Sequence, residues 1–192
     1  YNNFEPTLPG FYSEGKMVDS YKEVDSIMRG MGFLEIKTFV LTDKTNLMKS
    51  GYDGGVVEVL NPACEEFTIV RPSLMANVLE TFRMNKTKGL PQKIYEIGYV
   101  HDREKLKKSF IFAVMGENTS FADARGHLQA LAKEMGWKTE LRHDNIFWGE
   151  PGQAGAVYLD KKKIGYFGKV RKSVVDNFHI EFSVFVCELE LF

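Results

Sequence analysis

The feature of this sequence that most constrains its fold is the repeated alternation of apolar and polar residues, with few long helical stretches in between. Residues 93–100 and 109–116 show this period of two, and the charged stretch 102–108 that joins them indicates a hairpin with an exposed tip. Further strand-like segments cover residues 34–40, 56–60, 67–71, 138–142, 156–159, 164–170 and 183–191. This succession predicts an α+β domain with a mostly antiparallel sheet.

Apolar residues that recur at intervals of three and four predict helices beside this sheet. One stripe runs through residues 16–31, and another helix begins at Ser73, which can cap its amino terminus. The inward stripe of the second helix comprises Leu74, Val78, Leu79 and Phe82. Ser120 and Asp123 predict a third helix through a capping box.

Two shorter helices are expected at residues 44–49, where Thr42 can serve as the cap, and at residues 173–178. With 44% hydrophobic residues, the chain can bury one substantial core. We therefore expect residues 1–192 to form a single domain of a protein that does not enter a membrane and is located in the cytoplasm.

The composition excludes several classes of function. A net charge of -1 argues against a dedicated nucleic-acid binder. The two cysteines, Cys64 and Cys187, lack metal-ligand spacing, and no phosphate loop or dinucleotide fingerprint occurs. None of the four histidines stands beside a Ser or Cys in a recognisable nucleophile motif. We therefore expect no catalytic residue, no metal and no cofactor in this chain.

A local cluster of basic residues in the expected hairpin tip leaves two interpretations open. It consists of Arg103, Lys105, Lys107 and Lys108. These side chains could contact an RNA backbone, or they could form a solvated surface, which Asp102 and Glu104 favour by diluting the positive charge.

An ordered set of motifs covers residues 57–98. A strand ends in Asn-Pro, an Arg precedes a Ser-Leu helix start, an Asn follows that helix, and the next strand carries Glu-x-Gly. The landmark residues are Asn61, Pro62, Arg71, Ser73, Asn85, Glu96 and Gly98. In this order they resemble the beta subunit of archaeal and eukaryotic phenylalanine-tRNA ligase. The sequence departs from that family's pattern at residues 168–172, which read Gly-Lys-Val-Arg-Lys.

The resemblance implies a class II aminoacyl-tRNA synthetase-like fold and a non-catalytic role. The chain would be a C-terminal fragment of a longer beta subunit and would pair with the catalytic alpha subunit in an alpha-two beta-two assembly that charges tRNA-Phe. The first helix would then offer Met17, Tyr21, Val24 and Met28 to the partner. The same residues could instead be plain core.

The resemblance also indicates why the chain should be inactive alone. Class II synthetases place an Arg that binds the ATP α-phosphate two residues before a strand Glu, and this chain has Ile94 before Glu96. We also expect that the second Arg-bearing helix, which class II synthetases place after the final strand, is missing after the strand at residues 184–192. ATP and magnesium are thus implied for the holoenzyme only.

Alternatives remain at the level of residues and of the whole chain. Arg71 and Glu96 could form an ion pair within the domain or reach across to the alpha subunit. Asn61 is expected at a turn, and Gly98 at a close approach of two segments. The chain could also be a free-standing paralogue that binds a small molecule or an RNA, or an enzyme of another kind that uses the same cleft.

Overall fold

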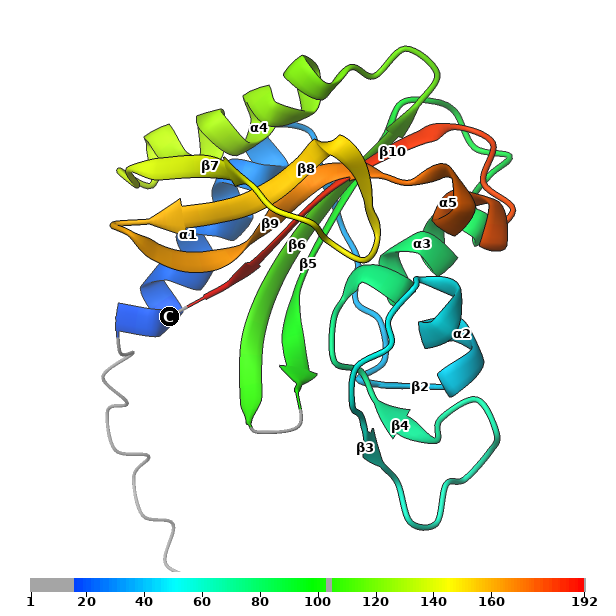
Figure 1. The fold of residues 1–192 in the computed structure, drawn as a ribbon. Helices are drawn as coiled ribbons and strands as arrows, with labels where there is room; N and C mark the ends of the chain where they lie inside the picture. The colour runs from blue at the N-terminus through cyan, green and yellow to red at the C-terminus, as the bar shows by residue number, and fades with distance from the viewer. Residues whose placement is uncertain (1–15, 103–104, 192) are drawn as a thin grey trace, which may run out of the picture.

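A seven-stranded sheet forms the centre of the computed structural model, which describes residues 16–102 and 105–191, with the backbone alone for residues 16–20 (Figure 1). In spatial order its strands are β1 Leu34–Glu35, β5 Gln92–His101, β6 Leu106–Gly116, β10 Ser183–Glu190, β9 Lys162–Val170, β8 Gly149–Leu159 and β7 Thr139–His143. The β1–β5 pair is parallel and the others are antiparallel. The predicted α+β class is confirmed, with a mixed sheet.

Helices cover both faces of this sheet (Figure 1). Helices α1 Lys16–Gly30 and α4 Phe121–Glu134 lie on one face, and α3 Met75–Met84 and α5 Lys172–Asn177 lie on the other. Because side chains alternate along a strand, β10 sends Phe185 and Cys187 into the α1/α4 core and Val184 and Val186 into the α3/α5 core. One sheet therefore separates two apolar cores.

The predicted start of α4 is found in the structure, whereas the predicted Ser73 cap of α3 is wrong: the N-cap of α3 is Leu74, whose side chain makes no capping hydrogen bond. Ser120 Oγ accepts a hydrogen bond of 3.1 Å from the Asp123 amide, and the Asp123 carboxylate accepts one of 3.0 Å from the Ser120 amide. This capping box begins α4 as expected. The stripe predicted for α3 is also confirmed, since Leu74, Val78, Leu79 and Phe82 are all fully buried.

The strand predicted at residues 34–40 is wrong in its length. The Ile36 amide still donates to the Tyr95 carbonyl at 2.8 Å, but at Thr38 the hydroxyl turns to the Glu96 carboxylate at 2.7 Å. The chain then leaves the edge of the main sheet. A polar contact with a buried carboxylate thus overrides the local alternation that favoured a longer strand.

After this departure the chain builds a second, smaller sheet that the sequence pattern did not predict. It consists of β2 Leu41–Thr42, β4 Ile69–Val70 and β3 Val57–Glu58, in that order. The strands expected at residues 56–60 and 67–71 are therefore only two residues long. Helix α2 Lys44–Lys49 follows β2 as predicted, but its cap is Asp43 and not Thr42, because Asp43 Oδ1 accepts from the Asn46 amide at 2.7 Å.

Candidate functional site: a buried polar network under α3

Polar side chains interrupt the apolar sheet face that α3 covers. Glu96 on β5 and Glu188 on β10 both lie opposite Ile111 of the intervening strand β6. Adjacent strands are about 4.8 Å apart, so the two carboxylates emerge about 10 Å from each other on one face. Ser109, also on β6, is buried beside them.

Arg71, which lies between β4 and α3, is the cation of this network. Its guanidinium Nη2 lies 3.0 Å from Glu96 Oε1, and both residues are 1% exposed. Arg71 Nε donates to the Tyr99 carbonyl at 2.9 Å, and Nη1 donates to Thr38 Oγ1 at 2.6 Å. A buried charge is tolerated only when it is paired and hydrogen-bonded, and these contacts meet both conditions.

The two partners of Arg71 are themselves linked. Thr38 Oγ1 donates to Glu96 Oε2 at 2.7 Å, so the hydroxyl joins the guanidinium to the carboxylate. Gly98 leaves the space that this arrangement needs, because a Cβ atom there would overlap the Arg71 guanidinium. The network thus ties the loop before β2, the approach to α3 and strand β5 into one unit.

Glu188 holds the other end of the network. Its Oε1 accepts from the Leu74 amide at 2.8 Å and from the Ser109 hydroxyl at 3.1 Å, and its Oε2 accepts from the Ser73 hydroxyl at 2.6 Å. Burial raises the pKa of Glu188, although these donors and Arg71 oppose the shift. The carboxylate therefore supports the amino terminus of α3, together with Ser73, whose Oγ accepts from the Met75 amide at 3.0 Å.

The sequence assigned no role to Glu188. The alternation along β10 could have indicated that Glu188 is buried. Val184 and Val186 point toward α3, and the period of two places residue 188 on the same face. A carboxylate at such a position needs donors from elsewhere in the fold. Those donors come from residues about 80 to 115 positions earlier in the chain.

The residues on this face do not fit a triphosphate. Ile94 is 6% exposed and packs in the core under α3, where an aliphatic side chain offers no charge to a phosphate. The guanidinium of Arg71 is already engaged by Glu96 and is enclosed. This network therefore holds segments of the fold together and leaves no cation available for a phosphate.

The remaining landmark residues lie apart from the network. Asn61 and Pro62 are exposed in the loop between β3 and β4. Asn85 ends α3, where its Nδ2 donates to the Thr81 carbonyl at 2.9 Å. The landmarks thus divide into a buried group and a group at the ends of elements.

The candidate interface residues of α1 are placed differently from the expectation. Val24 and Met28 are fully buried against the chain's own sheet, which corrects their assignment to a partner surface. Tyr21 is half-buried, and the side chain of Met17 lies outside the described residues. An amphipathic stripe looks the same in a sequence whether it packs on its own sheet or on another chain.

The described part of the basic hairpin tip is surrounded by acidic groups. Lys107 forms an ion pair with Asp102 and lies 3.8 Å from Glu190, and Lys105 lies 3.9 Å from the same carboxylate. The ammonium of Lys108 lies 4.8 Å from the centre of the Tyr21 ring. Arg103 lies outside the described residues. These contacts favour the solvated surface over a phosphate site.

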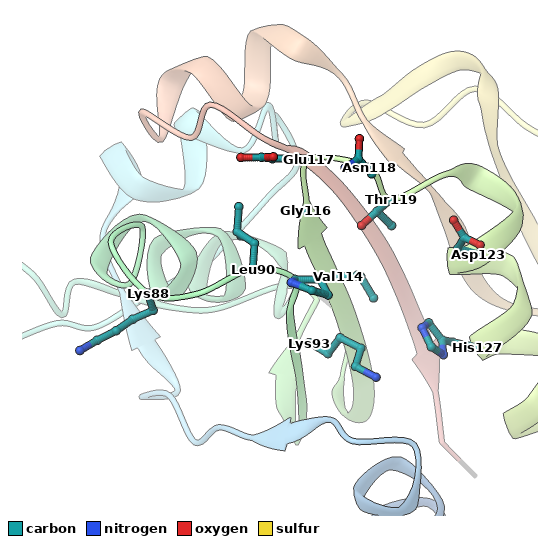
Figure 2. Close-up of a pocket in the computed structure, with 11 residues that line it drawn as sticks. Lys88, Leu90, Lys93, Val114, Gly116, Glu117, Asn118, Thr119, Asp123 and His127 are labelled. Carbon is teal, nitrogen blue, oxygen red and sulfur yellow. The ribbon is translucent and has the colours of Figure 1, made fainter.

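A separate hollow of about 680 Å³ lies between the start of α4 and the ends of β5 and β6 (Figure 2). Lys93 and His127 approach each other there, and Lys93 Nζ donates to the Met31 carbonyl at 2.7 Å. Burial and the charge of Lys93 lower the pKa of His127. Because Glu117 and Asp123 also line the hollow, its charges are mixed and select no ligand.

Comparison with known proteins identifies the family. The family model described as the phenylalanyl tRNA synthetase beta chain CLM domain matches residues 7–191. The chain belongs to this family. The resemblance carried by the landmark residues is thereby confirmed, and the buried network lies within the part of the chain that this family model matches.

Individual relatives of this CLM domain agree with the family model. A phenylalanine–tRNA ligase beta subunit from Methanocaldococcus jannaschii is 33% identical over 205 residues, covering 100% of this chain and 37% of the relative. One from Aeropyrum pernix is 29% identical over 198 residues, covering 100% of this chain and 36% of the relative. The chain thus spans little more than a third of the length of these relatives.

A solved structure supports the class II fold of the CLM domain. A pyrrolysyl tRNA synthetase from Desulfitobacterium hafniense superimposes with a TM-score of 0.75 at 13% identity, over 92% of this chain and 66% of the synthetase. At this identity the likeness shows the fold alone.

The described residues contain neither a candidate metal site nor a candidate membrane-spanning helix. No group of three or more His, Cys, Asp or Glu residues among them could hold a metal ion. No helix in the same part of the chain has the length and apolar character needed to span a membrane.

Proposed function

We propose that this chain is a structural and assembly module of phenylalanine-tRNA ligase, which supports the catalytic alpha subunit in charging tRNA-Phe. The observation that carries the proposal is the sheet face under α3. There a buried Arg71–Glu96 pair and the aliphatic Ile94 occupy a class II fold that matches beta chains. ATP and magnesium are assigned to the alpha subunit, the assembly is alpha-two beta-two, and its location is the cytoplasm.

An exposed apolar surface supports pairing with another chain. Phe39 is 74% exposed, Met84 is 71% exposed, and both line a groove of about 680 Å³ between α3 and the small sheet. Leu34, in the edge strand β1 of the main sheet, is 67% exposed. Exposed apolar patches are typical of interaction sites, and we assign the groove with Phe39 and Met84 to the alpha subunit in place of the buried stripe of α1.

Phenylalanine-dependent pyrophosphate exchange tests the proposal. The chain alone should show no exchange, because its α3 face offers no cation to the phosphates. A full-length beta subunit carrying this chain should copurify with the alpha subunit, and the complex should exchange. Exchange by the chain alone would contradict a non-catalytic role. A chain that stays monomeric beside the alpha subunit would contradict the assembly role.

A further inference from the structure

Strand β7 forms one edge of the main sheet (Figure 1). Its inner side pairs with β8 along its whole length. Among residues 16–102 and 105–191, no strand pairs with its outer side. Every second residue of an edge strand turns its N–H and C=O groups away from the sheet, where another strand can pair with them. The outer side of β7 can therefore accept a further strand.

The charges along this edge alternate in sign. Glu140 and Arg142 lie within β7, and Lys138 and Asp144 flank it. Because side chains alternate along an extended chain, these four lie on one face of the strand. Leu141 points to the other face, where it packs against the α1/α4 core. The edge of β7 thus presents a row of charges in the order plus, minus, plus, minus.

This row is complementary to itself in one antiparallel register. If two copies of β7 pair around Leu141, Glu140 lies opposite Arg142 of the second copy, and Lys138 lies opposite Asp144 of the second copy. A shift by two residues in one direction would place Arg142 opposite Arg142, and a shift in the other direction would place Glu140 opposite Glu140. Opposite charges on facing residues stabilise a strand pair and like charges destabilise it. The charges therefore favour one register and disfavour its two neighbours.

We propose that the edge of β7 binds a second copy of this chain, so that the main sheet continues across a twofold axis at Leu141. Each copy offers the same strand, as a symmetric dimer requires. Backbone hydrogen bonds supply the attraction, and two kinds of ion pair, each formed twice, set the direction and the register of the strands. The proposal does not depend on pairing with an alpha subunit, which was assigned to the groove at α3.

Contacts within one molecule do not prevent this pairing. Arg142 lies 2.7 Å from Glu140 of its own strand, and Asp144 lies 2.8 Å from Lys163. Both ion pairs are exposed to solvent, and exposed pairs contribute little to stability. A guanidinium also has five N–H donors, so Arg142 can bond to its own Glu140 and to that of the second copy together.

Sedimentation equilibrium of the purified chain without an alpha subunit tests the proposal. We expect a monomer–dimer equilibrium with a Kd below about 1 mM, because an interface of this size is small and weak. Arg142→Glu should weaken dimerisation by about tenfold or more, since it places two carboxylates opposite each other. The control Arg125→Glu makes the same charge change on the exposed side of α4 and should leave Kd within about twofold. A chain that remains monomeric, or a dimer that Arg142→Glu leaves unchanged, would overturn the proposal.

An equimolar mixture of two charge variants tests the pairing itself. Glu140→Arg and Arg142→Glu should each dimerise weakly alone, because each places like charges opposite each other. In the mixture every facing pair is again of opposite sign, so the two variants should dimerise with each other about as tightly as the unchanged chain does. Both side chains are exposed, so the fold should not depend on them. A mixture that stays monomeric contradicts the register, and loss of the unchanged dimer on addition of the alpha subunit would assign this edge to that subunit instead.

Discussion

The guanidinium of Arg71 connects segments that are distant in the sequence, since its partners lie at Thr38, Glu96 and Tyr99. Desolvation makes each isolated charge in such a place costly, and the ion pair is tolerated because both groups are satisfied. A single substitution here should therefore destabilise the fold mainly because it leaves the remaining charged partner buried and unpaired.

Replacing Arg71 with Met should strongly destabilise the chain. The variant leaves the Glu96 carboxylate buried with only the Thr38 contacts, and breaking a buried pair from one side typically costs about 3–5 kcal/mol. Urea denaturation measures the free energy of unfolding of each variant. The double variant Arg71→Met/Glu96→Leu should recover much of the lost free energy of unfolding. If Arg71→Met alone costs less than about 1 kcal/mol, the Glu96 carboxylate is hydrated in the variant and the argument is wrong.

Gly98 should not tolerate a methyl group. Gly98→Ala places a Cβ atom against the Arg71 guanidinium, which is fixed by Glu96, Thr38 and Tyr99, and overpacking of this kind costs about 1–3 kcal/mol. The matched control is Gly126→Ala in α4, where a Cβ atom meets nothing within 4 Å. That change should stabilise the helix by about 0.5–1 kcal/mol. If both variants change Tm in the same direction, the packing argument is contradicted.

His127 should make the protein less stable in mild acid. Burial and Lys93 lower its pKa from 6.5 in the folded state, so the unfolded chain binds a proton that the folded chain resists. Stability is therefore full above about pH 6.5 and falls as pH drops toward the folded pKa. The loss of Tm between about pH 7.5 and pH 5.5 should be smaller in His127→Gln than in the unchanged chain. Equal losses would rule out this histidine as the cause.

At the scale of elements, α4 depends on its first turn for part of its stability. Ser120→Ala removes the acceptor for the Asp123 amide and should cost about 1 kcal/mol. Ser120→Asp keeps an acceptor at the cap and should lose much less, as measured by urea unfolding. A loss of the same size in both variants would mean that the hydroxyl acts through something other than capping.

The long hairpin and helices were predictable from the sequence, and so were the short helices α2 and α5, but the two-residue strands were not. The hairpin of β5 and β6 and the helices α3 and α4 follow from local periodicity, and α4 also from its cap. The small sheet could not be predicted in this way, because a strand of two residues is too short to show a periodic pattern. Its position follows from the place where the chain leaves the main sheet, at the contact of Thr38 with Glu96. For the same reason the sequence indicated Arg71 and Glu96 but not the donors around Glu188, which depend on contacts across more than a hundred residues.

For the whole molecule, the exposed apolar surface around Phe39 and Met84 should decide assembly. Phe39→Asp/Met84→Asp should weaken copurification with the alpha subunit at least tenfold, because charges would be buried at the interface. Leu60→Asp is the control, since Leu60 is 96% exposed and does not line the groove. Thermal unfolding of each chain alone should change little. If the double variant copurifies as well as the unchanged chain, the interface does not include this surface.

The strand order has a consequence for how the protein is made. β10 lies between β6 and β9 in the main sheet, yet it follows every other strand of that sheet along the chain, and its Glu188 holds the start of α3 (Figure 1). During synthesis the strand edges of β6 and β9 that β10 covers therefore stay unpaired until residues 183–190 have emerged from the ribosome. Chaperones that shield unpaired edges would be most needed in that interval, and a ribosome that stalls before residue 183 would leave two unjoined halves.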